Sequence, residues 1–428
     1  MQISRFRHAG MTVTDHEVRV ALAHDEPDGA TISVFAREVV AAERTGLDQP
    51  WLLFLQGGPG GKGPRPASPA SWLTRALKDH RVLLLDQRGT GRSAPITRQT
   101  LPRVGWPELQ AEHLAHFRAD SIVADAEVLR RELVGEESAW HVLGQSYGGF
   151  CALTYLSQAP EFLASVAITG GLPPLTAPAE EVYRISYDRV AEKNARFFDT
   201  FPQDRDRVTA VVQHLRTHDV RLPTGEQLSP ERFLTIGVEL GATSGFDPLH
   251  YLLDEAFVPG SDTPVLSETF LAGVHAVVSY ATRPLFPVMH EPSYGQGEAT
   301  RWAADRVRRE RPDFDPQLDE PLLTGEMTYP FQLRQDPALA DLADAADLLA
   351  ERTDWPALYD LEALAANDVP VAAAIYHDDM YVVREHSLET ARRVRGLRTW
   401  VTNEFEHDGL RQSADVLDRL LAMNAGRL

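Results

Sequence analysis

Residues 144–148 read Gly-Gln-Ser-Tyr-Gly and place Ser146 between two glycines. A short apolar run at residues 140–143 precedes this pattern, and a helix-forming run at residues 150–156 follows it. A serine at a sharp turn between a buried strand and a helix presents its hydroxyl above the sheet, and small neighbours make room for the strained backbone. The pattern also occurs as an ordinary glycine turn, but this context favours a nucleophile. We therefore predict that Ser146 attacks a carbonyl carbon.

A nucleophilic serine needs a general base, and the base needs a carboxylate to orient it. When the serine lies at such a turn, the chain order of the three groups is serine, acid, histidine. Asp379 follows an apolar run at residues 369–375, and His407 follows the next one at residues 399–402. Because the carboxyl ends of parallel strands meet at one edge of a sheet, we expect both side chains near Ser146.

Two neighbouring residues compete for these roles. Asp378 directly precedes Asp379 and is a rival for the acid, although the acid usually lies a few residues beyond the strand end, which favours Asp379. His377 is the nearest rival for the base, but it precedes the acid instead of following it on the next strand. The predicted catalytic residues are Ser146, Asp379 and His407.

A glycine-rich loop, Gln-Gly-Gly-Pro-Gly-Gly-Lys-Gly, occupies residues 56–63 and imitates two phosphate-binding loops. Its last six residues fit Gly-x-Gly-x-x-Gly, and Asp86 ends the next predicted strand, as in a dinucleotide site. However, prolines follow the loop, so no helix begins where a pyrophosphate needs one. A Walker-A loop is excluded because Gln56 stands at the first glycine position and Gly63 at the serine or threonine position.

An oxyanion hole explains the same loop better. Backbone N–H groups of Gly57, Gly58 and Tyr147 can donate hydrogen bonds to a carbonyl oxygen as it becomes negative. Glycines keep the loop free of side chains, so the donors can approach the reacting atom. We predict that these three residues form the oxyanion hole beside Ser146.

The elements that must position these residues alternate along the chain. Helical patterns at residues 122–133 and 150–156 lie between apolar runs that are too short for helices. Those runs occupy residues 51–55, 82–85, 140–143, 165–168, 369–375 and 399–402. Residues 11–20 and 31–40 alternate and indicate an antiparallel entry to the sheet. The pattern predicts an α/β fold, a mostly parallel sheet flanked by helices.

The alternation stops near Gly171 and resumes near residue 346. The intervening pattern is mostly helical, with one clear helix start where Ser229 is the N-cap and Pro230 the first helical residue. Helices inserted between strands of one sheet form a cap over its ligand-binding edge. We therefore predict a first core part at 1–172, a helical cap at 173–345 and a second core part at 346–428.

The composition excludes several classes of partner. The 428 residues include 42 Lys plus Arg and 62 Asp plus Glu, a formal net charge of −20, which argues against nucleic acids and anionic membranes. The single cysteine, Cys151, excludes an intrachain disulfide and a cysteine-based metal site. The amino-terminal residues lack a signal-peptide pattern, and no apolar run spans a bilayer. We expect a cytoplasmic protein without metal or cofactor; the sequence does not indicate its oligomeric state.

Taken together, the motifs resemble those of the proline iminopeptidase (prolyl aminopeptidase) family of α/β-hydrolases. That family carries a His-Gly-Gly-Pro-Gly loop, an Asp-Gln-Arg-Gly-x-Gly-x-Ser turn and a Gly-x-Ser-x-Gly-Gly elbow. Here the three motifs stand in the same order at residues 56–60, 86–93 and 144–149, with Gln56 in place of the histidine. The resemblance implies an α/β-hydrolase fold with a mainly helical cap. The turn at residues 86–93 is expected to tie a loop beneath the site.

The resemblance also implies a serine peptidase that releases an N-terminal residue, often proline, from a peptide or amino-acid amide through an acyl-enzyme. Such an enzyme must recognise a free amine, and cap glutamates do this in the family. Glu291 and Glu326 are candidates here, each with a solvated surface acid as the alternative. An esterase or lactonase with the same triad is the nearest alternative. A non-catalytic ligand-binding protein is disfavoured by the complete Ser, Asp and His set.

Overall fold

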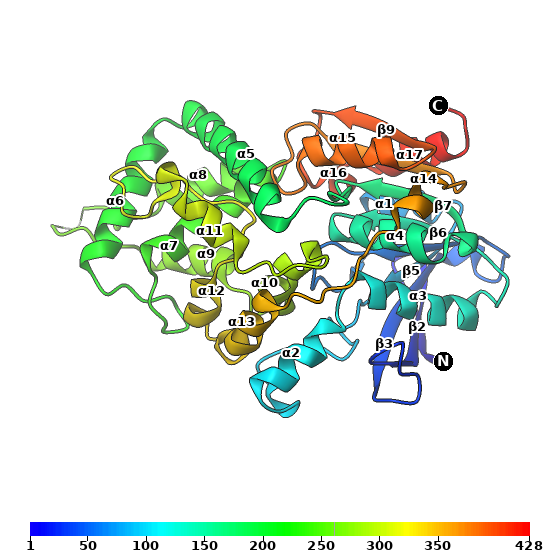
Figure 1. Cartoon of the computed structure of the whole chain (residues 1–428). Helices are drawn as coiled ribbons and strands as arrows, with labels where there is room; N and C mark the ends of the chain where they lie inside the picture. Colours follow the sequence, from blue (N-terminus) through cyan, green and yellow to red (C-terminus); the bar gives the residue numbers. More distant parts are fainter. Residues whose placement is uncertain (261) are drawn as a thin grey trace.

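The computed structural model describes residues 1–260 and 262–428, and they form one large sheet with helices on both faces and a helical region beside it (Figure 1). Within these residues the sheet has nine strands in the order β1-β2-β3-β5-β4-β6-β7-β8-β9. Strands β1 to β3 and the β3–β5 pair are antiparallel, and all other pairs are parallel. The strands are β1 (Gln2–His8), β2 (Met11–Ala21), β3 (Thr31–Ala41), β4 (Trp51–Leu55), β5 (Arg81–Leu85), β6 (Trp140–Gln145), β7 (Leu163–Thr169), β8 (Val371–Tyr376) and β9 (Leu397–Thr402).

The central strands are mostly apolar, as expected where helices cover both faces of the sheet. Leu52 and Phe54 of β4 pack in one cluster with α1 (Ser71–Ala76) and α17 (Ala414–Asn424). Leu53 and Leu55 face the other side and pack with α3 (Ala119–Leu133) and α4 (Tyr147–Gln158). The predicted α/β architecture, a mostly parallel sheet flanked by helices, is confirmed. The remaining core helices are α2 (Pro107–Ala115), α14 (Leu361–Ala365), α15 (Arg384–Arg393) and α16 (Gly409–Gln412).

The helices α5 to α13, which we call the helical insertion, lie between β7 and β8 in the chain and form the green and yellow region of Figure 1. Most of them pack around an apolar cluster that includes Tyr187, Phe197 and Phe233, whereas α10 and α13 pack in a second cluster with α2. As predicted, Ser229 caps a helix and its hydroxyl accepts the Arg232 N–H at 3.2 Å. The helices of the helical insertion are α5 (Ala179–Thr200), α6 (Gln203–Thr217), α7 (Pro230–Leu234), α8 (Phe246–Asp254), α9 (Glu268–Val278), α10 (Leu285–Met289), α11 (Ala303–Arg309), α12 (Pro330–Gln335) and α13 (Ala343–Glu351).

The division of the chain into core, cap and core stays a prediction, and its second boundary, at residue 345, falls inside α13. Among the residues that the structure describes, no helix combines the length and apolar character needed to cross a bilayer. The helical insertion and the sheet meet at the carboxyl edge of the parallel strands, where the candidate site lies.

Candidate active site

Ser146 lies at the junction of β6 and α4 with a strained backbone, φ 55° and ψ −127°. A positive φ is unusual for a residue with a Cβ and marks a tight, specified turn. The two pattern glycines make this turn sterically possible. A Cβ on Gly144 would lie 2.4 Å from the Gly148 carbonyl oxygen, and a Cβ on Gly148 would lie 1.9 Å from the Leu55 carbonyl oxygen. The sequence pattern is therefore a packing requirement of the elbow.

The acid and the base predicted from the chain order form a hydrogen-bonded pair. Asp379 follows β8 and His407 follows β9. Both are buried, and His407 Nδ1 lies 2.7 Å from Asp379 Oδ2. The other carboxylate oxygen of Asp379 accepts the N–H groups of Tyr381 at 2.8 Å and Val382 at 3.1 Å, which fixes its orientation. Burial alone lowers the pKa of His407, but the Asp379 carboxylate outweighs it and raises that pKa above its ordinary value.

Asp378, the rival acid, pairs with residues other than His407. One of its carboxylate oxygens lies 3.0 Å from His377 Nδ1, and the other lies 3.1 Å from Arg196 Nη1. His377 is itself exposed and paired with Asp378. The geometry therefore favours Asp379 and His407 over both rivals.

A cavity of about 280 Å³ joins the nucleophile to the base. Its walls come from the glycine-rich loop, the elbow, the histidine loop and the helical insertion. The lining residues on the sheet side include Gln56, Gly57, Gly58, Ser146 and His407, and those on the side of the helical insertion include Val238, Glu239, Arg283, Phe286 and Glu326. Ser146 and His407 therefore face a shared space that is large enough for a small substrate.

The glycine-rich loop approaches the nucleophile closely. A Cβ added to Gly57 would come within 2.8 Å of the Ser146 Cβ, so no other residue fits there without a shift. The backbone N–H groups of Gly57, Gly58 and Tyr147 have no acceptor among the residues that the structure describes. Free donors beside a nucleophile are the requirement for an oxyanion hole.

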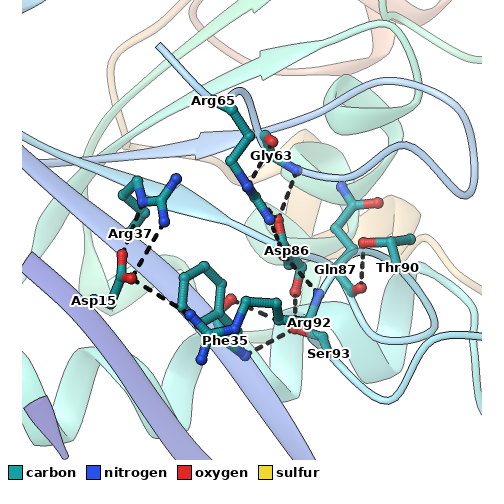
Figure 2. A network of polar contacts seen from close by, with 10 residues as sticks. All are labelled: Asp15, Phe35, Arg37, Gly63, Arg65, Asp86, Gln87, Thr90, Arg92 and Ser93. Atoms are coloured by element: carbon teal, nitrogen blue, oxygen red, sulfur yellow. Dashed lines mark hydrogen bonds and ion pairs between the residues drawn. The ribbon is translucent and has the colours of Figure 1, made fainter. Parts of the chain in front are cut away.

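Asp86 and Gln87 hold the two ends of this loop, and Figure 2 shows the contacts of Asp86 with Gly63 and Arg65 at one end. The buried Asp86 carboxylate accepts the N–H of Gly63 at 3.0 Å and a guanidinium N–H of Arg65 at 2.9 Å. The Gln87 side-chain amide donates to the carbonyl of Gln56 at 2.9 Å. The turn at residues 86–93 thus ties the loop beneath the site, as expected from its charged side chains.

Replacing Asp86 with asparagine should weaken this bracing. Asparagine has an N–H₂ group in place of one carboxylate oxygen of Asp86. An N–H₂ group cannot accept hydrogen bonds, so buried N–H donors that bonded to that oxygen lose their acceptor. We expect the free energy of unfolding to fall by about 2–3 kcal/mol, measured by urea titration. Asp418→Asn is the matched control, because Asp418 forms an exposed ion pair with Arg75, and it should change stability by less than about 0.5 kcal/mol. Equal stabilities for both variants would contradict the bracing role.

Glu326 is the predicted amine-binding residue that the structure brings to the cavity. Only 18% of its side chain is exposed, and its Oε2 lies 4.0 Å from His290 Nε2. Burial raises the pKa of Glu326 to about 7, although the nearby His407 and Arg283 partly oppose this shift. Within the described part of the chain no Lys or Arg forms an ion pair with Glu326, and burial lowers the pKa of His290 to about 4, so a bound ammonium group would supply the cation that the carboxylate lacks.

Glu291, the other predicted amine-binding residue, has a different place. Its two carboxylate oxygens accept the N–H groups of Ala303 and Ala304, both at 2.9 Å, at the start of α11. It is buried away from the cavity lining, and burial raises its pKa to about 7. The arrangement is that of a side chain satisfying a helix N-terminus.

Glu239 lines the cavity but was missed at the level of the sequence. It lies in the 3₁₀ helix η4 (Thr235–Gly241) and is half-buried, which raises the pKa of its carboxyl group against the influence of Arg283. The signal was available, because Glu239 is a single acid in the apolar run at residues 236–240. Within residues 1–260 and 262–428, no group of three or more His, Cys, Asp or Glu side chains is arranged to hold a metal ion.

Comparison with known proteins agrees with the geometry. Residues 50–257 match the family model described as alpha/beta hydrolase fold. The chain is 46% identical over 418 residues to a proline iminopeptidase from Aeromonas sobria, with 97% of each chain covered. It is 34% identical over 448 residues to a proline iminopeptidase from Aspergillus aculeatus, with 100% of this chain and 97% of that chain covered. Among solved structures, esterase E22 aligns with 96% of this chain and all of its own, at 10% identity and a TM-score of 0.47. The two full-length relatives show that the chain belongs to the proline iminopeptidase family of α/β-hydrolases.

Proposed function

We propose that this protein is a serine aminopeptidase that releases an N-terminal residue, proline in particular, from short peptides or amino-acid amides through an acyl-enzyme. The observation that carries the proposal is one cavity lined by the strained Ser146, by His407 with its Asp379 partner, and by the buried Glu326. The names of the two full-length relatives support the same activity.

In the proposed mechanism, the Ser146 hydroxyl oxygen attacks the carbonyl carbon of the N-terminal residue while His407 Nε2 takes the hydroxyl proton. Asp379 accepts the hydrogen bond from Nδ1–H and stabilises the imidazolium. The N–H groups of Gly57, Gly58 and Tyr147 donate to the oxyanion of the tetrahedral intermediate. His407 then protonates the leaving amine, and water releases the acyl group by the same steps.

We assign recognition of the free amine to Glu326 and Glu239 rather than to Glu291. Both carboxylates face the cavity that holds the nucleophile, whereas the oxygens of Glu291 already accept two helix N–H groups. A partly desolvated carboxylate gains most from a cation, because the ion pair replaces water that burial has removed. An ammonium group between these acids places the adjacent carbonyl near Ser146.

Three substrates test the proposed activity. Proline 4-nitroanilide carries a free amine, N-acetyl-proline 4-nitroanilide lacks it, and 4-nitrophenyl acetate needs only the triad. We expect cleavage of the free anilide and no cleavage of the acetylated one. Hydrolysis of the ester alone would keep the triad and overturn the peptidase assignment in favour of an esterase.

Replacing Glu326 with glutamine should raise KM for proline 4-nitroanilide at least tenfold, with kcat changed about threefold or less, because a charged hydrogen bond contributes about 1.5–3 kcal/mol. The KM of the parent enzyme should fall as the pH rises through about 7, where Glu326 ionises, and the variant should lose that dependence. Steady-state kinetics at several pH values measure both effects.

Two controls sharpen this test. Glu291→Gln should leave KM within about twofold and lower only the melting temperature, because Glu291 serves a helix terminus. At alkaline pH, where His407 is neutral, Glu326→Gln should leave hydrolysis of 4-nitrophenyl acetate within about twofold, since the ester has no amine; the acid limb should move to lower pH, because Glu326 helps to raise the pKa of His407. An unchanged KM in Glu326→Gln, or a larger rise in Glu291→Gln, would refute the assignment of Glu326.

A further inference from the structure

The loop that carries His407 is held by the helical insertion. Three consecutive residues of the loop each contact the segment 241–243. The Glu406 N–H donates to Thr243 Oγ1 at 3.1 Å, and the His407 N–H donates to the Gly241 carbonyl at 3.3 Å. The Thr243 N–H in turn donates to Asp408 Oδ1 at 2.9 Å. The backbone position of the catalytic base therefore depends on an element outside the sheet.

A buried ion pair fastens the same loop to helix α5. Lys193 Nζ lies 2.5 Å from Glu406 Oε2, and the side chains are 1% and 17% exposed. Burial lowers the pKa of Lys193 and raises that of Glu406, while each partner opposes the shift of the other. A lysine this deeply buried is stable only with its partner in place, so the pair constrains both elements. Glu406 is the residue directly before His407.

Helix α5 reaches the acid of the triad in the same way. Arg196 lies three residues after Lys193, on the same face of the helix, and its Nη1 lies 3.1 Å from Asp378 Oδ2. Asp378 directly precedes Asp379. The Arg196 side chain is 53% exposed, so this pair contributes less than the buried one. One face of α5 thus contacts the residue before each of the two partners of Ser146.

We propose that Lys193, assisted by Arg196, is a positioning residue for catalysis. Through Glu406 it fixes the loop of His407, so the imidazole is aligned with Ser146 only while the helical insertion is seated on the sheet. A displacement of about 1 Å in a catalytic group can cost a hundredfold in rate. This inference rests on the proposed roles of Ser146 and His407, and it is independent of the preference for proline.

The variant Lys193→Met tests the proposal, with Arg189→Met as the matched control. Arg189 lies on the same helix and also crosses to the sheet side, 3.0 Å from Glu385 of α15, but it contacts neither triad loop. A fluorophosphonate probe reports the reactivity of Ser146 without any need for an amine. For Lys193→Met we expect the labelling rate and kcat for proline 4-nitroanilide to fall about a hundredfold, with KM within about threefold. Arg189→Met should stay within about twofold in both.

The double variant Lys193→Met/Glu406→Gln separates positioning from stability. Removing both charges eliminates the unpaired buried carboxylate, so the melting temperature should recover toward that of the parent. If Lys193 positions His407, kcat and labelling stay at least tenfold low despite this recovery; full recovery of both would overturn the proposal. A labelling rate in Lys193→Met within twofold of the parent would overturn it as well. If Lys193→Met does not fold, Glu406→Gln alone carries the test, with an expected loss of about tenfold in labelling and less than twofold overturning it.

The fluorophosphonate probe separates the test of Lys193 from the test of the proposed peptidase activity. If proline 4-nitroanilide is not cleaved by the parent enzyme, the proposed function fails, and the labelling rates of the variants still decide the role of Lys193. If the anilide is cleaved and Lys193→Met labels at the parent rate, the proposed function stands and the positioning role fails.

Discussion

Replacing Ser146 with alanine should lower kcat for proline 4-nitroanilide by about a millionfold, to the limit of detection. The alanine lacks the only group in the cavity that the mechanism assigns to attack the carbonyl. The fold should persist, because Ser146 and alanine carry the same Cβ at the strained φ of 55°. Activity is measured with the anilide over long incubations, and stability by thermal unfolding.

The control for this variant is the other nucleophile nearby in the chain. Cys151 lies buried on α4, and burial raises the pKa of its thiol far above the ordinary value, so it cannot replace the serine. Cys151→Ser should therefore keep kcat within about threefold. Fluorophosphonate labelling that persisted in Ser146→Ala would show that another residue is the nucleophile.

Replacing Asp379 with asparagine should lower kcat by about ten-thousandfold. The asparagine side chain cannot stabilise the imidazolium, and its N–H₂ group favours the wrong tautomer of His407. The loss should appear with both proline 4-nitroanilide and 4-nitrophenyl acetate, because both reactions need the base. Asp378→Asn is the matched control and should lose no more than about fivefold, since Asp378 contacts His377 and Arg196 instead. Similar losses in the two variants would contradict the choice of Asp379.

The same pair of variants gives a pH test. His407 must be neutral to take the serine proton, so activity is lost as the pH falls through its pKa. Asp379 raises that pKa above its ordinary value, so the acid limb of kcat/KM lies at a correspondingly higher pH in the parent enzyme. In Asp379→Asn the limb should move to lower pH, whereas in Asp378→Asn it should stay in place. The ester is the substrate of choice, because it has no amine for Glu326 to bind, and both variants keep Glu326, so its influence on the pKa of His407 is present in each.

The sequence predicted those parts of the fold and site that depend on local signals. Apolar runs identified the buried strands, and the glycine pattern around Ser146 identified the elbow, because both follow from sterics within a few residues. The chain order of the triad then led to Asp379 and His407. By contrast β1 (Gln2–His8) was not predicted, since it is an exposed edge strand with no apolar face to create a pattern.

Residues whose role depends on distant packing were harder to predict. Glu239, Glu291 and Glu326 are all acids in locally apolar segments, and their local sequences do not say which of them face the cavity. That is decided by tertiary packing, which brings Glu239 and Glu326 to the cavity and the carboxylate of Glu291 to the start of α11. The choice between Asp378 and Asp379 likewise depends on the turn after β8, where the N–H groups of Tyr381 and Val382 orient the carboxylate of Asp379.

The sheet is interrupted in the chain between two strands that are neighbours in space. β7 ends at Thr169 and pairs with β8, which begins at Val371, so the partner of β7 is synthesised about 10–40 s later at ordinary translation rates. During that interval a growing chain on the ribosome presents β7 as an open apolar edge that can pair with other chains. Protection by chaperones in this window should govern the yield of active enzyme more than the stability of the finished protein. A chain released within it would carry the nucleophile without its acid or base and would be inert.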